Sequence, residues 1–211
     1  MTLHDQQLQT IESYDRTAKA FSSSIGRLSN YDHTYDAMAD QLNEGDLLLD
    51  LACGPAQISG YIWDKKTIRV TGVDLSSEML SIARDRIPDG EFFKASILDF
   101  RQGGPYDGIL LGFGLPYLDE AQLSPCLTNA ASLLKPGKAI YLSFMHGRGC
   151  RVETTSFGGD HEFLIHYHPK DHVRAVLKEQ GLGVLKEFEL DYEESDGSIT
   201  KDVVLIARKK G

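Results

Sequence analysis

Short apolar runs alternate with helical patterns through most of this chain of 211 residues, and this alternation restricts its fold more than any other feature. Leu47–Leu51 is an apolar run that meets a turn of small residues, and residues 58–62 then take helical spacing. The same unit recurs at Ile68–Val73, after which Ser76 can cap a second helix. Strands that alternate with helices form a parallel sheet covered on both faces. The chain is therefore predicted to be a doubly wound α/β fold.

Three further strands continue this pattern. They are predicted at Glu91–Ala95, Gly108–Gly112 and Ala139–Met145, and the near-continuous apolar run of the second is typical of a central parallel strand. A helix is predicted to begin at Ser124-Pro125 and to end at residues 135–137, since proline is favoured at the first helical position. The C-terminal residues alternate in polarity around a turn at 196–197, which predicts an antiparallel hairpin. The sheet is thus expected to have seven strands, mostly parallel, with this hairpin at its end.

Two segments lie outside the regular alternation. Residues 1–43 have two apolar stripes at helical spacing, which predict an N-terminal helical cap. Residues 146–168 contain two strand-like runs, 151–157 and 161–167, which predict an inserted β-hairpin over the active site. The cap and the hairpin are expected to close the mouth of the site from opposite sides. The whole chain, residues 1–211, is predicted to be one domain.

Charge and cysteine content narrow the possible partners. With 22 basic and 31 acidic residues the net charge is −9, which argues against nucleic acid as a partner. The three cysteines form no C-x-x-C pair and are interpreted as reduced thiols, which predicts a cytoplasmic protein. No apolar run approaches the roughly 18 residues that a membrane span needs. The oligomeric state is left open.

Acidic residues follow two of the predicted strands, where ligands bind in open α/β sheets. Asp50 lies at the end of the first strand and Asp74 at the end of the second, 24 residues later. A carboxylate has two acceptor oxygens and can therefore accept two hydrogen bonds from one ligand. Either residue alone could merely end a strand or cap a helix, whereas the two together favour a ligand site.

The stretch Asp50-Leu51-Ala52-Cys53-Gly54-Pro55-Ala56 resembles motif I of the class I S-adenosylmethionine-dependent methyltransferases. The companion motifs arrive in order, at Gly72-Val73-Asp74-Leu75-Ser76, at 93–100, at 106–109 and at 133–137, so the resemblance covers about residues 44–211. It implies a Rossmann-like methyltransferase fold with S-adenosylmethionine as cofactor. The implied activity is transfer of a methyl group to a small-molecule acceptor by direct in-line displacement.

The resemblance also assigns cofactor-binding residues. Asp50, Ala52 and Gly54 would surround the methionyl end, and Asp74 with Leu75 the ribose. The full implied set is Tyr14, Tyr31, Asp50, Ala52, Cys53, Gly54, Asp74, Leu75, Met79, Ser96, Ile97 and Gly112. The sequence departs from the motif where Ala52 and Ala56 replace glycines, and where Ser96 stands in place of an aspartate that many relatives have. These departures predict weaker cofactor binding.

Acceptor and catalytic residues are predicted less directly. Phe113, Pro116 and Tyr117 are interpreted as a wall of the acceptor pocket. A pocket base at its mouth is predicted among His146, His166 and His168, because histidine titrates near neutral pH. No metal site is predicted, since these histidines have no cysteine partner at zinc-site spacing.

Two alternatives remain open at this point. A non-catalytic cofactor-binding or partner protein would have the same fold, because fold alone does not fix function. An NAD-dependent oxidoreductase also has an acidic residue after the second strand, but the G-x-G-x-x-G motif is not met after Ala52. Turnover to S-adenosylhomocysteine would distinguish a methyltransferase from the non-catalytic protein. Selective binding of S-adenosylmethionine or of NAD would distinguish it from the oxidoreductase.

Overall fold

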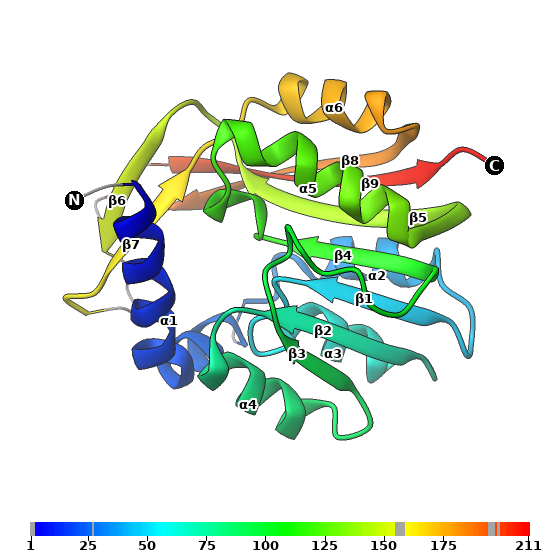
Figure 1. Cartoon of the computed structure of the whole chain (residues 1–211), viewed down its shortest axis with the longest axis horizontal. Helices are drawn as coiled ribbons and strands as arrows, with labels where there is room; N and C mark the ends of the chain where they lie inside the picture. The colour runs from blue at the N-terminus through cyan, green and yellow to red at the C-terminus, as the bar shows by residue number, and fades with distance from the viewer. Residues whose placement is uncertain (1–2, 27, 155–158, 194–196, 198) are drawn as a thin grey trace.

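The computed structural model describes residues 3–26, 28–154, 159–193, 197 and 199–211 (Figure 1). Within these ranges a seven-stranded sheet has the order β3-β2-β1-β4-β5-β9-β8. Its strands are β1 (Leu47–Leu51), β2 (Arg69–Asp74), β3 (Glu91–Lys94), β4 (Tyr106–Gly112), β5 (Leu134–Met145), β8 (Leu182–Glu193) and β9 (Ile199–Lys209). The first five are parallel, whereas β9 is antiparallel to both β5 and β8. The predicted fold class is confirmed.

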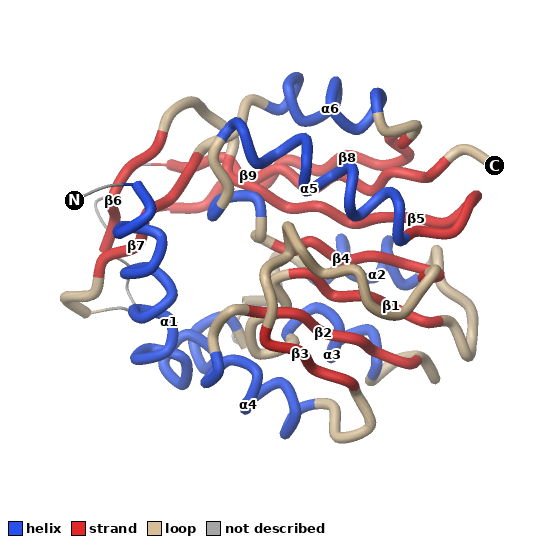
Figure 2. Tube along the Cα trace, viewed as in Figure 1, coloured by secondary structure: helices blue, strands red, loops and turns tan. Residues whose placement is uncertain are grey.

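Side chains alternate between the two faces of the sheet and join two separate cores. Leu49 and Leu51 of β1 pack in one core and Leu48 in the other. Helices α5 (Glu120–Leu133) and α6 (Lys170–Glu179) cover the first face. Helices α2 (Asp32–Ala39), α3 (Gln57–Trp63) and α4 (Ser77–Arg86) cover the second, as Figure 2 shows. The layers are therefore those of a doubly wound fold.

Two elements stand beside the carboxyl ends of the parallel strands, at the left of Figure 1. They are helix α1 (Leu3–Ile25) and the separate hairpin of β6 (Cys150–Thr154) and β7 (Glu162–His166). Leu164 N–H donates to Thr10 Oγ1 at 2.9 Å, and the Ser13 hydroxyl donates to the Glu162 carbonyl at 2.8 Å. The expectation that cap and hairpin would approach from opposite sides is therefore wrong. They lie against each other, because Thr10 and Ser13 satisfy backbone groups on the edge of β7 that β6 does not cover.

Helix α5 begins earlier than the sequence predicted. Its N-cap is Asp119, whose side chain accepts from Gln122 N–H while the Gln122 side chain accepts from Asp119 N–H. This capping box fixes the start of the helix, and Pro125 lies inside it. The helix also ends sooner than predicted, because Leu134 already pairs with Tyr106 as the first residue of β5.

Helix α6 has a proline and a glycine at its two ends. Pro169 is its N-cap, and Gly181 after the helix has φ +73°, the left-handed conformation in which glycine is favoured at this position. Residues 155–158 of the predicted hairpin and residue 196 of the predicted C-terminal turn lie outside the described residues. None of the described helices combines the length and the apolar character needed to cross a bilayer.

Candidate functional site

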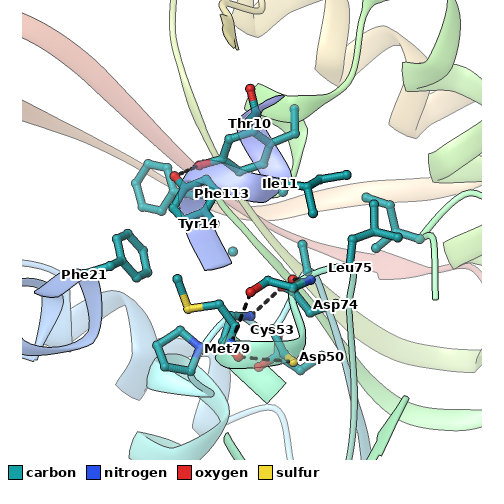
Figure 3. A pocket seen from close by; sticks show the side chains of 18 of the residues that line it. Thr10, Ile11, Tyr14, Phe21, Asp50, Cys53, Asp74, Leu75, Met79 and Phe113 are labelled. Atoms are coloured by element: carbon teal, nitrogen blue, oxygen red, sulfur yellow. Dashed lines mark hydrogen bonds between the residues drawn. The ribbon is translucent and has the colours of Figure 1, made fainter. Parts of the chain in front are cut away.

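A cavity of about 450 Å³ lies between the carboxyl ends of the parallel strands and helix α1. Figure 3 shows side chains from α1 and from the strand ends converging on it. All of the predicted cofactor residues line this cavity, together with two of the three predicted acceptor residues. They are Tyr14, Tyr31, Asp50, Ala52, Cys53, Gly54, Asp74, Leu75, Met79, Ser96, Ile97, Gly112, Phe113 and Tyr117. Pro116 is buried in the short helix η1 (Leu115–Tyr117) and does not line it.

The turn after β1 forms one wall of the cavity through its backbone conformation. Ala52, Gly54 and Ala56 have φ angles of 57°, 52° and 59°, so every second residue is left-handed. This geometry explains why glycine is favoured at these positions, since a Cβ in the left-handed region costs roughly 1–2 kcal/mol. A Cβ added at Gly54 would meet only Phe21 Cε1, at 4.0 Å. The backbone at Gly54 therefore faces open space, as a backbone that cradles a ligand must.

Asp74 joins the turns that follow β1 and β2. Its two oxygens accept from Gly54 N–H at 2.8 Å and from Ser76 N–H at 2.9 Å. Burial raises the pKa of Asp74, and the backbone hydrogen bonds act in the opposite direction. The carboxylate is thus oriented before any ligand arrives, and each oxygen has a further lone pair for a hydroxyl donor.

Asp50 lies deeper, at the end of β1, and is 3% exposed. Burial raises the pKa of Asp50 to about 7, and the nearby Asp74 carboxylate acts in the same direction. A buried carboxylate of this kind is stabilised in its ionised form by a cationic partner. Asp50 is therefore suited to the ammonium group of a ligand that enters the cavity.

Aromatic side chains enclose the end of the cavity beneath α1. The Tyr14 ring meets the Phe21 and Tyr117 rings edge-on at centroid distances of 5.4 and 5.5 Å. The Tyr14 and Tyr117 hydroxyls are hydrogen bonded to each other. Tyr31 meets Phe113 edge-on at 5.7 Å. These rings leave an apolar space whose polar edge is a pair of phenols.

The Tyr31 hydroxyl has a different partner from the one predicted by resemblance. It donates to Asp202 Oδ2 at 2.5 Å, and Asp202 is a buried residue of β9. The ring of Tyr31 thus lines the cavity while its hydroxyl ties the start of α2 to the sheet. Any contact of Tyr31 with a ligand is expected to come from its ring.

None of the three candidate histidines lines the cavity as the structure describes it. His146 Nδ1 accepts from Lys170 N–H at 3.1 Å, and His168 Nε2 lies 2.9 Å from the Leu115 carbonyl. His166 is buried in β7, and burial lowers the pKa of both His166 and His168. His146 and His168 therefore contact backbone groups at the starts of α6 and η1, and the role of pocket base finds no support in the lining of the cavity.

Helix α1 supplies lining residues that the motif reasoning did not assign. Besides Tyr14, its contributions are Gln7, Leu8, Thr10, Ile11, Phe21 and Ile25. The signal was present in the sequence, because Leu8, Ile11, Phe21 and Ile25 belong to the apolar stripe that predicted the helix. Helical spacing predicts that this stripe is buried. It does not show whether the stripe packs in a core or lines a cavity.

The fold and this site together define a class of protein: a Rossmann-like α/β domain with a cavity at the ends of β1 and β2, the place where open α/β sheets bind their ligands. Residues 48–137 match the family model described as "Methyltransferase domain". This segment is thus similar to methyltransferase domains, in agreement with the resemblance of its motifs to the class I S-adenosylmethionine-dependent methyltransferases.

Curated relatives resemble only part of the chain. Trans-aconitate 2-methyltransferase of Escherichia coli O157:H7 is 33% identical over 97 residues, which cover 45% of this chain and 37% of the relative. A dTDP-3-amino-3,4,6-trideoxy-alpha-D-glucopyranose N,N-dimethyltransferase of Streptomyces venezuelae is 29% identical over 122 residues, 55% of this chain and 51% of the relative. The chain thus spans about a third to a half of the length of these relatives.

Solved structures resemble the whole chain at low identity. The 1,6-didemethyltoxoflavin-N1-methyltransferase of Burkholderia thailandensis, solved with S-adenosylhomocysteine, has a TM-score of 0.74 at 15% identity and covers 100% of this chain and 92% of its own. The [4+2]-cyclase SpnF has a TM-score of 0.72 at 16% identity, over 94% and 95% of the two chains. These likenesses concern the fold alone.

Proposed function

We propose that this chain binds S-adenosylmethionine and transfers its methyl group to a small-molecule acceptor by direct in-line displacement. The observation that supports this most strongly is that the predicted cofactor residues meet at one place in the structure. All twelve residues that sequence resemblance assigned to the cofactor line one cavity, although they come from segments between Tyr14 and Gly112. The matched family model and the named activities of the relatives agree with this proposal.

The residues of the cavity fit the cofactor group by group. The pre-oriented carboxylate of Asp74 offers acceptors to two ribose hydroxyls, with Leu75 beside it, and Met79 offers an apolar contact to an adenine ring. Asp50 offers a counter-charge to the methionyl ammonium. The open space over Gly54 would admit the ligand close to the backbone. In the proposal these residues bind and orient the cofactor and take no part in bond breaking.

When bound, the cofactor supplies an activated methyl carbon, whose bond to sulfur breaks with the electron pair going to sulfur as the acceptor lone pair forms the new bond. The chain contributes orientation, for which effective molarities correspond to about 7–11 kcal/mol of barrier. Its apolar walls also keep water from the reacting atoms. A base on the protein is not required for an acceptor that is already a good nucleophile.

Calorimetric titration with S-adenosylmethionine, S-adenosylhomocysteine and NADH tests the cofactor assignment. We expect micromolar binding of the two adenosyl-sulfur ligands and no binding of NADH. Asp74→Asn keeps the shape of the side chain but removes its charge, and should weaken S-adenosylhomocysteine binding about tenfold to a hundredfold. Asp89→Asn, on an exposed turn, is the matched control and should bind as the unmodified protein does.

Release of S-adenosylhomocysteine in the presence of an acceptor tests the transfer itself. Binding of S-adenosylmethionine without turnover across a broad acceptor panel would favour a non-catalytic cofactor-binding protein of this fold. Selective binding of NADH would overturn the proposed cofactor.

A further inference from the structure

Of the aromatic side chains that line the cavity, the cofactor assignment includes only Tyr14 and Tyr31. Tyr14 and Phe21 reach into the cavity from α1 (Figure 3), and Phe113 and Tyr117, from the segment after β4, also line it. Tyr31 completes the wall through its edge-on contact with Phe113. Flat rings at several angles around one space favour a flat apolar occupant, because aromatic side chains prefer edge-to-face and offset contacts with other rings.

The charges around the cavity have one sign. Among the described lining residues, the acidic side chains are Asp50 and Asp74, and none is lysine, arginine or histidine. A carboxylate-bearing acceptor would lose its hydration here and find no cationic side chain to compensate. The described walls therefore select against an anionic acceptor.

The polar edge of this space is neutral. A phenol donates one hydrogen bond and accepts up to two, and the contact between the Tyr14 and Tyr117 hydroxyls uses a single proton. Tyr117 can therefore bond one further polar group beside Tyr14. Burial raises the pKa of Tyr117 to about 12 and raises that of Tyr14 as well, so both phenols stay protonated. They can recognise a hydroxyl or a ring N–H group without adding charge.

Resting on the proposed function, we propose that the methyl acceptor is a small, uncharged aromatic molecule whose ring packs among Phe21, Tyr31 and Phe113 and whose hydroxyl or ring N–H group bonds to the Tyr14–Tyr117 pair. This class differs from the carboxylate named in the E. coli relative. The difference would arise at the α1 end of the cavity, where the walls are aromatic and lack a described cation.

A matched pair of probes tests the charge selection in the unmodified protein. Methyl 4-hydroxybenzoate and 4-hydroxybenzoate share a ring and a hydroxyl, and only the second is an anion at neutral pH. Titrated into the protein with and without saturating S-adenosylhomocysteine, the ester should bind at least about ten times more tightly than the acid. Equal or tighter binding of the acid, or no binding of either probe, overturns the inference.

Leu8 provides a gain-of-function test. It lines the cavity from α1 and is 48% exposed, so a polar side chain is tolerated there. Leu8→Lys adds the missing cation, and Leu8→Gln is the matched neutral control. The lysine variant should bind 4-hydroxybenzoate several-fold more tightly than the glutamine variant, with little change for the ester. Identical acid affinity in the two variants would contradict the electrostatic argument.

The phenol pair is tested by Tyr117→Phe, which keeps the ring and removes one hydroxyl. Affinity for methyl 4-hydroxybenzoate should fall about threefold to tenfold, whereas methyl benzoate, which has no hydroxyl, should be unaffected. Equal losses for both probes would refute the role of the hydroxyl. S-adenosylhomocysteine affinity is read separately, so failure of that ligand to bind would overturn the proposed function while the probe comparison still judges the acceptor class.

Discussion

At the scale of the residue, Asp50 is the group most sensitive to its surroundings. Its carboxyl lies at the floor of the cavity with a pKa of about 7, compared with a usual value of 3.8. Between these two values the folded protein binds a proton that the unfolded chain does not, so the stability of the unliganded protein should decline as pH rises from about 4 to 7. Without a ligand the folded protein favours the protonated form of Asp50 below pH 7. A cationic ligand favours the ionised form instead, because it stabilises the carboxylate.

This coupling predicts pH-dependent cofactor binding. The affinity for S-adenosylhomocysteine should be constant above pH 8 and fall by up to about tenfold for each pH unit below 7, since the ionised fraction of Asp50 falls in that proportion. Asp50→Asn should bind more weakly at pH 8 and lose most of this dependence. A flat profile for the unmodified protein between pH 5.5 and 8 would show that Asp50 does not bind the ammonium group.

Tyr31 predicts an effect on stability. Replacing Tyr31 with Phe removes the 2.5 Å donor to the buried Asp202, and the free energy of unfolding should fall by about 1–3 kcal/mol. Tyr35→Phe, one helical turn away and also at the cavity wall, is the control and should cost less. Urea unfolding measures both, and S-adenosylhomocysteine titration shows whether the ring alone preserves binding. If the Tyr31→Phe protein has unchanged stability but binds the ligand poorly, the Tyr31 hydroxyl bonds to the ligand and its bond to Asp202 does not stabilise the fold.

At the scale of the element, helix α1 is held at two places across the cavity. Thr10 and Ser13 bond to β7, and Asp15 Oδ1 accepts from the Ser76 hydroxyl at 2.5 Å and from Glu78 N–H at 3.2 Å. The second contact places a negative charge at the N-terminus of α4, where the helix dipole favours it. The contacts on both sides of the helix are hydrogen bonds between polar groups, which open more easily than an apolar core.

Asp15→Ala should therefore loosen α1 without unfolding the sheet. Hydrogen exchange of α1 amides should become about five to thirty times faster, the equivalent of a loss of 1–2 kcal/mol, while exchange in β4 and β5 stays unchanged. Glu12→Ala, on the exposed side of the same helix, is the control. Equal acceleration in both variants would mean that helix propensity, and not the contact with α4, sets the exchange rate.

The sequence predicted most elements and a large part of the site because both depend on local patterns. The carboxyl ends of parallel strands meet at one edge, so Asp50 and Asp74 could be brought together from strand assignments alone. The position of α1 against β7 could not, because it depends on contacts such as Thr10 with Leu164, between segments that no sequence period connects. The same holds for the bond of Tyr31 to Asp202, which only the assembled sheet creates.

At the scale of the whole molecule, one part of the ligand site could be predicted from the sequence and another part could not. The strand ends that would hold the cofactor follow from alternation and motif, and their residues were named correctly as neighbours. The end beneath α1 is built from an N-terminal helix and the segment after β4. Its shape depends on tertiary packing. For this reason the sequence motifs did not predict the chemical class of the acceptor.

The order of the strands also has a consequence for synthesis of the protein. Strand β9 follows β8 along the chain but lies between β5 and β8 in the finished sheet. While the nascent chain is still emerging from the ribosome, the edge of β5 has no partner, and an open apolar edge is a site for aggregation. Completion of the sheet must therefore wait for β9. A message cut short before residue 199 would yield a chain that chaperones retain or proteases remove, however complete its cofactor motifs are.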